Sequence, residues 1–342
     1  MTADLAAALL EYLRRELGEP ALRFAEAPTP VSGGFDTRIF AFRLAGAPPA
    51  CSGPLILRLL APHHDPVRAV RERVIQNALA DLDYPAPRAR WVSADASLLG
   101  GAFIVMERLR GRPLLEERFF NLSTVLVDVQ ARLHDLDAEV LLRALEREGP
   151  PLSREVITFD AYLGQMEARI ADGGLEGLQR AMSWLRERRP PEPGRRAICH
   201  GDFHPQNILS EGGVVTGVLD WPNALVADPA YDVASTRIIL ALTPIALSGV
   251  PAALRWVASF VRLMLVKRYL AGMRRRRPLD PAVLGYYEAA SAMRGLVRTA
   301  EHRRRRASSV TSPLDASAFG DMLARHFARV TGVLPMLPPR AG

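Results

Sequence analysis

The chain has 342 residues, of which 49% are hydrophobic and 24% are charged. This composition fits one large globular domain or two ordinary ones, and it excludes wholly disordered and collagen-like proteins. The cysteines, Cys51 and Cys199, are too few for a disulfide framework or a four-cysteine zinc site. We therefore expect a reducing, cytoplasmic location.

The formal net charge of +7 is mostly due to arginine, since Lys267 is the single lysine. Residues 233–342 carry 18 basic and 5 acidic side chains, a net of +13, whereas residues 1–232 have a net of −6. The C-terminal third is therefore expected to present a cationic surface that attracts anions and repels polycations.

Neither an export signal nor a membrane span is expected. Between residues 1 and 17, leucines recur at helical spacing among charged side chains, which predicts an amphipathic helix. The most apolar long segment, residues 238–254, is interrupted by Pro244 and Pro251 and flanked by arginines. This pattern predicts two buried helices joined by a turn rather than a span.

After the first helix, the sequence up to Leu109 predicts a small α+β unit. Alternating or short apolar runs predict strands, and an apolar stripe at helical spacing predicts one helix among them. The predicted strands are residues 35–44, 55–60, 89–92 and 102–106, and the predicted helix is residues 67–82.

From Leu114 onward, the pattern is mainly helical, with short strands around one group of loops. The predicted helices are residues 123–136, 159–171, 176–188 and most of the chain after Tyr231, and the predicted strands are residues 197–200, 206–209 and 214–219. We expect two domains, residues 1–109 and residues 110–342.

The densest chemical signal is His-Gly-Asp-Phe-His-Pro-Gln-Asn-Ile-Leu at residues 200–209, followed by Val-Leu-Asp-Trp at residues 218–221. Oxygen ligands from Asn207 and Asp220, at the ends of adjacent strands, suit Mg²⁺, which takes a few protein oxygens plus phosphates. Asp202 is left to face an acceptor hydroxyl. The order Asp, Asn, Asp matches the groups that protein kinases use in phosphoryl transfer.

These motifs resemble the signatures of the aminoglycoside phosphotransferase/choline kinase-like group of small-molecule kinases. Residues 200–209 resemble its catalytic loop, residues 218–221 its metal-binding signature, and residues 227–234 the block that follows. A weaker likeness runs from about residue 28 to residue 236. The resemblance implies a protein-kinase-like two-lobed α+β fold, with a small antiparallel-sheet N-lobe and a large helical C-lobe, and ATP and Mg²⁺ as cofactors.

The resemblance also assigns nucleotide-binding residues to the N-lobe. Residues 31–40 resemble the nucleotide loop of the family, whose glycines let backbone N–H groups approach phosphate. The backbone of residues 106–108 resembles the hinge that hydrogen-bonds adenine. The residues assigned to the nucleotide are Gly33, Gly34, Phe35, Asp36, Thr37, Arg58, Glu72, Met106, Glu107 and Arg108.

Arg58 departs from the usual pattern, because kinases carry a phosphate-contacting lysine at this point. Arginine can still pair with phosphate oxygens, often through two N–H groups. Glu72, on the next helix, is placed to pair with Arg58 as kinases pair lysine and glutamate. The substitution leaves a non-catalytic, nucleotide-binding pseudokinase open as an alternative.

Four residues are assigned supporting roles rather than chemistry. By analogy, His200 braces the loop, and His204 either touches the acceptor or fixes the loop. Asp228 and Asp232 precede helical sequence and are expected to cap a helix or support the loop. Cys199 lies in an apolar strand and is expected to be an inert core thiol.

The expected function is an ATP-dependent kinase that transfers the γ-phosphate to a hydroxyl of a neutral or anionic small molecule. In the family the C-terminal helices build the acceptor cleft, and a segment with a net of +13 would disfavour a polycationic aminoglycoside. The alternative within the enzyme class is an aminoglycoside or macrolide phosphotransferase. Sugars, amino alcohols and hydroxyacyl compounds also stay open as acceptors. Some relatives in this broad family are fused to acyl-CoA dehydrogenases, and a hydroxyacyl acceptor would suit the basic lobe.

A further alternative is a protein that binds nucleic acid or an acidic partner through the arginine runs 274–277 and 303–306. Neither interleaved aromatic residues nor a nucleic-acid motif accompanies these runs, so nucleic acid is not the expected partner. The oligomeric state is not predicted.

Overall fold

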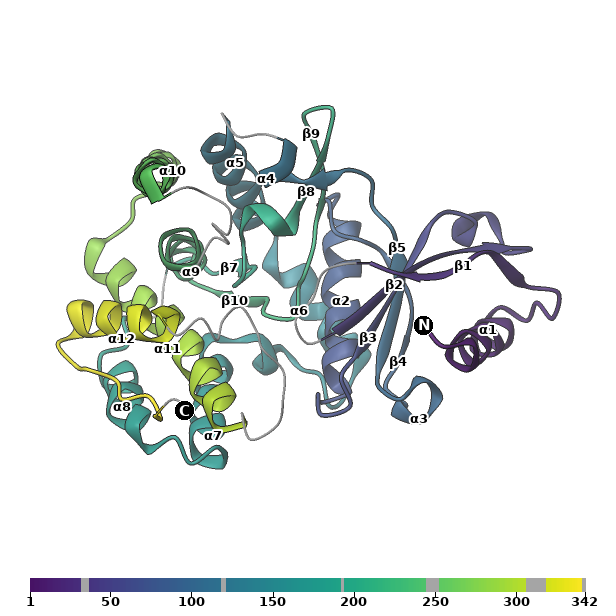
Figure 1. Ribbon diagram of the computed structural model, residues 1–342, viewed down its shortest axis with the longest axis horizontal. Helices are drawn as coiled ribbons and strands as arrows, with labels where there is room; N and C mark the ends of the chain where they lie inside the picture. Colours follow the sequence, from purple (N-terminus) through teal and green to yellow (C-terminus); the bar gives the residue numbers. More distant parts are fainter. Residues whose placement is uncertain (32–36, 118–120, 192–193, 244–251, 306–317, 340–342) are drawn as a thin grey trace. The chain divides into compact units, whose positions relative to one another are not determined.

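The computed structural model describes residues 1–31, 37–117, 121–191, 194–243, 252–305 and 318–339. The chain forms two compact units, and both are assembled from separated segments (Figure 1). The first unit comprises Met1–Glu117, Glu139–Ser153 and Ile208–Pro222, and the second comprises Arg118–Ala138, Arg154–Asn207 and Asn223–Gly342.

The first unit contains a five-stranded antiparallel sheet in the order β1-β2-β3-β5-β4. Four of its strands fall where the sequence predicts them. β1 was not predicted, because Pro28 and Pro30 argue against a strand. It lies at the sheet edge, where a missing N–H is tolerated. The strands are β1 (Arg23–Pro30), β2 (Thr37–Ala45), β3 (Leu55–Leu60), β4 (Ala89–Ser93) and β5 (Phe103–Glu107).

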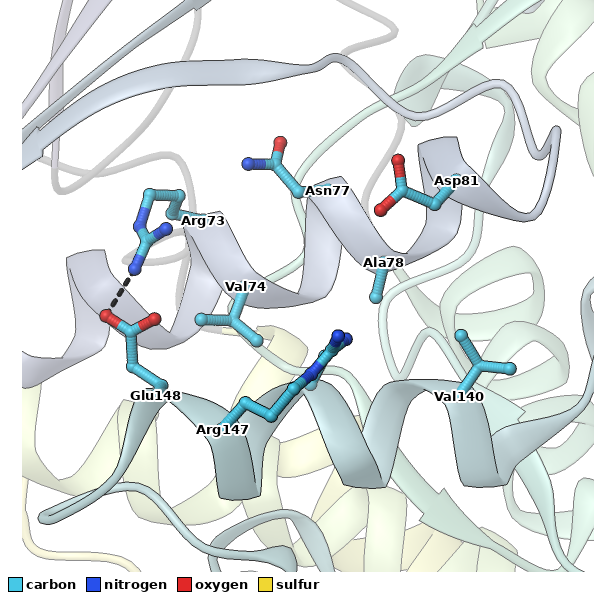
Figure 2. A pocket seen from close by; sticks show the side chains of 9 residues that line it. Arg73, Val74, Asn77, Ala78, Asp81, Val140, Arg147 and Glu148 are labelled. Atoms are coloured by element: carbon cyan, nitrogen blue, oxygen red, sulfur yellow. Dashed lines mark hydrogen bonds and ion pairs between the residues drawn. The ribbon is translucent and has the colours of Figure 1, made fainter.

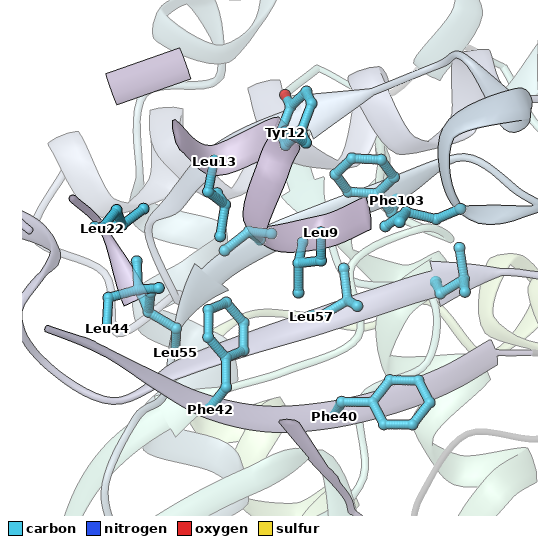
Figure 3. Packing of buried hydrophobic residues seen from close by; sticks show 13 residues of the cluster. Leu9, Tyr12, Leu13, Leu22, Phe40, Phe42, Leu44, Leu55, Leu57 and Phe103 are labelled. Carbon is cyan, nitrogen blue, oxygen red and sulfur yellow. The ribbon is translucent and has the colours of Figure 1, made fainter. Parts of the chain in front are cut away.

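One face of this sheet is covered by α1 (Ala3–Leu17), as Figure 3 shows. Thr2 caps the start of α1, and Gly18 ends it in a left-handed conformation. Leu9 and Leu13 are fully buried against the sheet. Burying such a side chain contributes about 1.5–3 kcal/mol, so the leucine stripe holds α1 on the sheet. The partners from the sheet include Phe40, Phe42, Leu55, Leu57 and Phe103.

The opposite face of the sheet packs against α2 (Val67–Asp81). Side chains alternate between the two faces of a strand, so Arg58 points away from its buried neighbours Leu57 and Leu59. Small and apolar residues, among them Ala69 and Ile104, fill the contact with α2. The one charged residue of β3 therefore lies on the face that α2 covers.

A further helix of the first unit, α6 (Ala138–Glu148), runs beside α2 (Figure 2). This helix was not predicted from the sequence, although Leu141, Leu142 and Leu145 are buried along one stripe. Polar and apolar side chains line the groove between the helices in similar measure, and an Arg73–Glu148 ion pair closes one end. This pair ties the segment 139–153 to the N-terminal part of the chain.

The rest of the first unit includes a small sheet in the order β6-β8-β9. Trp221 follows β9 and is fully buried, with its indole N–H donating to the Val218 carbonyl oxygen at 2.8 Å. Its ring meets Tyr84 edge-on at 5.8 Å. The elements are α3 (Ala96–Leu99), β6 (Arg112–Pro113), α4 (Leu114–Glu117), β8 (Ile208–Glu211) and β9 (Val214–Val218), with a 3₁₀ turn at Pro49–Cys51.

The second unit is mainly helical, with one antiparallel pair of strands, β7 and β10. Two helices, α9 and α10, lie on either side of residues 244–251, as the sequence predicts for the most apolar segment. The predicted burial is found in α9, whereas the first described side chains of α10 include the exposed Val257 and Phe260. Within the parts of the chain that the structure describes, no helix combines the length and apolarity needed to cross a bilayer. The elements are α5 (Leu122–Asp135), α7 (Phe159–Asp172), α8 (Gln179–Glu187), β7 (Ala197–Cys199), β10 (Leu225–Ala227), α9 (Pro229–Leu242), α10 (Ala252–Arg276), α11 (Pro281–Arg305) and α12 (Ala318–Thr331), with 3₁₀ turns at Arg154–Ile157, Glu176–Leu178 and Pro205–Asn207.

Candidate active site

In the first unit, Arg58 bridges two carboxylates. Its Nη1 atom pairs with Glu72, and its Nη2 atom donates to Asp220 Oδ1 at 2.8 Å. Glu72 is only 1% exposed and also accepts a hydrogen bond from Gln76 Nε2 at 3.2 Å. A planar guanidinium can hold two carboxylates at once, whereas a lysine ammonium is a compact point charge. The predicted Arg58–Glu72 pair is therefore present, and Asp220 joins it.

Burial and charge act in opposite directions on this group. Burial by itself lowers the pKa of the Arg58 guanidinium, but the carboxylates of Glu72 and Asp220 outweigh it and raise that pKa above its usual value. Burial also raises the pKa of the Glu72 carboxyl, against the opposing effect of Arg58. Arg58 thus keeps its positive charge and can serve as an anion-binding group.

Asp220 has an unusual backbone conformation. Its φ of +67° lies in the left-handed region that non-glycine residues seldom adopt. The residue follows β9 and precedes the buried Trp221, so packing on both sides fixes this turn. The Asp220 side chain remains 39% exposed, and its carboxylate is accessible from solvent.

In the second unit, the loop 200–207 after β7 places Asp202 and Asn207 together. The Asn207 side-chain amide donates to the Asp202 carbonyl oxygen at 3.0 Å. The Asp202 N–H donates to His200 Nδ1 at 3.2 Å, and the Asn207 N–H donates to the His204 carbonyl oxygen at 2.9 Å. These bonds fix the loop backbone on both sides of the Asp202 carboxylate.

A buried aspartate on α9, Asp232, also holds this loop in place. Asp232 accepts the Gly201 N–H at 2.8 Å and pairs with His134 Nε2 at 3.0 Å. Gly201 has a φ of +74°, and a Cβ there would lie 2.5 Å from the Asn223 carbonyl oxygen. Burial tends to raise the pKa of the Asp232 carboxyl, but the His134 contact brings it below its usual value. The loop therefore depends on a glycine and on an ionised carboxylate.

Arg294, on α11, lies beside Asp202. Its Nη2 atom is 3.6 Å from Asp202 Oδ1, and its side chain is 20% exposed. Sequence reasoning missed this residue, because Arg294 follows the loop at a long separation and no motif surrounds it in α11. The fold therefore places a positive charge beside the Asp202 carboxylate, which the sequence did not indicate.

The supporting residues have the contacts expected for structural roles. Asp228 is the N-cap of α9 and accepts the Ala230 N–H at 2.8 Å. His204 Nδ1 accepts the Gln206 N–H at 3.3 Å inside the loop. Cys199 is fully buried, and burial raises the pKa of its thiol well above the usual value, so it is poorly nucleophilic.

The hinge prediction falls on residues whose backbone donors are already used within the first unit. The Glu107 N–H donates to the Arg88 carbonyl oxygen at 3.0 Å, and the Arg108 N–H donates to the Pro54 carbonyl oxygen at 2.9 Å. Met106 is buried in β5. Adenine contact at the hinge stays a prediction.

The nucleotide-loop prediction falls largely on residues 32–36. Gly33, Gly34, Phe35 and Asp36 lie outside the described residues. Thr37 is the first residue of β2 and pairs with Leu60 of β3.

Several members of the arginine runs form ion pairs within the second unit. Surface pairs contribute little to stability, and here Arg277 and Arg303 are largely buried whereas Arg276 and Arg304 are exposed. All four pairs offset part of the positive charge of these helices. The pairs are Arg276–Asp128, Arg277–Asp135, Arg303–Asp321 and Arg304–Glu176.

Solved structures establish the class of fold. A protein of Ralstonia eutropha assigned to the aminoglycoside phosphotransferases superposes with a TM-score of 0.62 at 20% identity, covering 95% of this chain and 98% of that one. A thermostable mutant of aminoglycoside phosphotransferase APH(4)-Ia, in a ternary complex with ADP and hygromycin B, gives a TM-score of 0.56 at 17% identity, covering 95% and 96%. The fold is that of the kinase-like aminoglycoside phosphotransferases, as the sequence predicts.

The family follows from the sequence match. Residues 28–279 match the model of the phosphotransferase enzyme family, and the chain belongs to that family. Among curated relatives, human acyl-CoA dehydrogenase family member 11 is 28% identical over 179 residues, or 48% of this chain. The match covers only 22% of that relative, so the chain spans a small part of its length.

Proposed function

We propose that the protein is an ATP-dependent small-molecule kinase that transfers the γ-phosphoryl group to a hydroxyl of a neutral or anionic acceptor. The observation that carries the proposal is the loop 200–207, whose backbone is fixed by Asn207 and Asp232 around the Asp202 carboxylate. Membership of the phosphotransferase family supports the reaction class. The ADP in the APH(4)-Ia complex supports an adenine nucleotide as the donor.

In this mechanism, Asp202 orients the acceptor hydroxyl and accepts its proton. The hydroxyl oxygen bonds to the γ-phosphorus while the bond from that phosphorus to the bridging oxygen breaks and ADP leaves. A carboxylate is a weak base at neutral pH, so positioning contributes more than basicity. The several hydrogen bonds that fix the loop backbone serve that purpose.

We assign Mg²⁺ to Asn207 and Asp220. The Asn207 amide nitrogen is used in its bond to Asp202, which leaves the amide oxygen as a ligand, and Asp220 offers a partly exposed carboxylate. These are the hard oxygen ligands that Mg²⁺ prefers. When bound, the ion neutralises charge that develops on the phosphates.

We assign the triphosphate to Arg58 and to the loop 33–37, and adenine to the backbone of residues 106–108, where the N–H groups of Glu107 and Arg108 would have to exchange their present carbonyl partners for the base. Nucleotide binding then belongs to residues 1–109 and acceptor binding to residues 110–342. The buried free thiols of Cys51 and Cys199 fit a reducing, cytoplasmic location.

Thermal melting tests the nucleotide assignment. Samples contain Mg²⁺ with ATP, ATP with EDTA, or Mg²⁺ alone. Ligand at about 100 times its Kd adds roughly 2.7 kcal/mol, which raises Tm by a few degrees for a chain of this length. We expect a shift that requires both metal and nucleotide. An unchanged Tm at millimolar Mg²⁺ and ATP would contradict the proposal.

Substitution of Asp202 tests the reaction. We expect Asp202→Ala to lower the rate of ADP formation by about 10²–10⁴-fold while the Tm shift with Mg²⁺ and ATP persists. Asp172→Asn, at an exposed position at the end of α7, is the matched control and should behave like the wild type. Near-normal turnover by Asp202→Ala would refute the mechanism.

An antibiotic acceptor is the second candidate, because the APH(4)-Ia complex contains hygromycin B. Turnover of hygromycin B or kanamycin at rates above those of uncharged and anionic acceptors would favour it. The net of +13 in residues 233–342 argues against a polycationic acceptor.

A further inference from the structure

We propose that Arg294 is an oxyanion-binding residue of the acceptor site, so that the acceptor carries a carboxylate or phosphate group close to the hydroxyl that is phosphorylated. This inference rests on the proposed kinase function, because it takes Asp202 as the residue that meets the hydroxyl. It narrows the acceptor from neutral or anionic to anionic.

The first support is the geometry of Arg294 and Asp202. Both residues belong to the second unit, and the closest atoms of the pair, Nη2 and Oδ1, are 3.6 Å apart. That separation is an ion pair without a well-formed hydrogen bond. The guanidinium is therefore near enough to reach a group adjacent to a hydroxyl on Asp202, and it is not saturated by that carboxylate.

The second support is an unused donor. Arg294 Nη1 is buried and has no hydrogen-bond partner among the residues that the structure describes. A buried cationic N–H without an acceptor is costly, so such a group is usually met by a ligand or by water. The fork of a guanidinium matches the paired oxygens of a carboxylate or phosphate. The donor edge of Arg294 therefore has the chemistry to bind an acceptor anion.

The third support is that the acids of α11 are already occupied. Glu288 pairs with Arg237, and Glu301 pairs with Arg169 at 2.7 Å. An ammonium group entering beside Arg294 would meet a positive charge without a spare carboxylate on the same helix. This arrangement selects against cationic acceptors as well as for anionic ones.

The test uses Arg294→Gln and Arg294→Lys, with Arg325→Gln at an exposed position of α12 as the charge-matched control. ADP formation is measured with Mg²⁺ and ATP on matched acceptors. The pairs are glycerate against glycerol, glycerol 3-phosphate against glycerol, and 3-hydroxybutyrate against its methyl ester, with hygromycin B as the cationic acceptor.

We expect the wild type to prefer the anionic member of at least one pair by about tenfold or more in kcat/KM. Arg294→Gln should lower kcat/KM for that anion by about 10- to 100-fold, mainly through KM, and should lower it much less for the uncharged partner. Arg294→Lys should keep part of the preference, and Arg325→Gln should match the wild type.

Three results would overturn the inference. One is equal turnover of charged and uncharged partners, and another is an equal loss on both in Arg294→Gln, which is the effect expected if Arg294 only holds Asp202. The third is no turnover of any anion by an enzyme that Mg²⁺ and ATP stabilise. Loss of that stabilisation in the wild type would instead count against the proposed function. Should Arg294→Gln melt early, the preference of Arg294→Lys decides the question.

Discussion

Arg58 is the residue at which this chain departs most from the usual kinase pattern. Where kinases carry a lysine ammonium, this chain has a guanidinium whose two Nη atoms pair with Glu72 and Asp220 at the same time. The charge of Arg58 compensates a buried carboxylate, and in the function that we propose it also attracts phosphate. The arginine thus links the stability of the first unit to its proposed function.

We expect Arg58→Met to lower the free energy of unfolding by about 3–5 kcal/mol, because Glu72 would remain buried without its partner. Arg58→Met combined with Glu72→Met should recover most of that loss, since neither charge is then buried alone. Urea denaturation of both variants measures the difference. Losses that simply add in the double variant would show that the pair is not coupled.

Asp232 predicts a specific dependence of stability on pH. The folded state lowers the pKa of this carboxyl, so its contribution is present above the ordinary value of about 3.9 and is lost as the pH falls through the folded value. We expect Asp232→Asn to cost about 1–3 kcal/mol at pH 7, where the Gly201 and His134 contacts favour the ionised form.

The difference between wild type and Asp232→Asn should therefore shrink as the pH falls below about 4. Urea denaturation at several pH values measures it. Asp172→Asn, with its exposed side chain, is the control and should cost little at any pH. A gap that widens in acid would mean that the ionised form of Asp232 does not stabilise the loop.

At the scale of elements, the loop 200–207 is held by contacts between parts of the chain that are distant in sequence. Asp232, on α9, is 31 residues from Gly201, and its other partner, His134 on α5, is 98 residues away from it. The motif itself could be read from the sequence because its residues are local. Its supports could not, because they depend on which helices pack together.

Gly201→Ala should damage this loop more than an equivalent change elsewhere. Gly18, with a φ of +66° and open space around it, is the matched control. We expect Gly18→Ala to cost about 1–2 kcal/mol from the left-handed backbone alone. We expect Gly201→Ala to cost at least about 3 kcal/mol, because the added Cβ meets Asn223, and to lower turnover by about 10²-fold through displacement of Asp202. Equal losses of stability, with unchanged turnover, would contradict this account.

The strands and helices with strong periodicity were predicted correctly. Among the elements that were missed, β1 and α6 were missed for different reasons. β1 contains two prolines and is largely exposed, so its sequence lacks the apolar, β-branched pattern typical of a strand. It exists because β2 offers an unpaired edge. α6 carries a clear apolar stripe, so the signal for it was present in the sequence.

At the scale of the whole molecule, the family and the fold were accessible from the sequence, since the motifs at residues 200–209 and 218–221 have characteristic spacing. The charge distribution was also visible, but its meaning required the structure. Several arginines of the runs are paired with acids, whereas Arg294 lies outside the runs, and its Nη1 atom has no hydrogen-bond partner in the described parts of the chain. The net charge indicated that the surface is positive, but it could not identify Arg294 as the arginine beside Asp202.

The interleaving of the two units has a consequence for how the protein is made. The first unit takes its last segment from Ile208–Pro222, which supplies Trp221 to Tyr84 and Asp220 to Arg58. During synthesis the ribosome completes this unit only after more than half of the chain has been made. Until residues 208–222 have been made, the Tyr84 ring lacks its contact with Trp221 and Arg58 Nη2 lacks its ion pair with Asp220. The nascent chain is partly folded during this time. Neither unit can therefore be expressed as one uninterrupted fragment of the chain, because each is built from segments that alternate along the sequence.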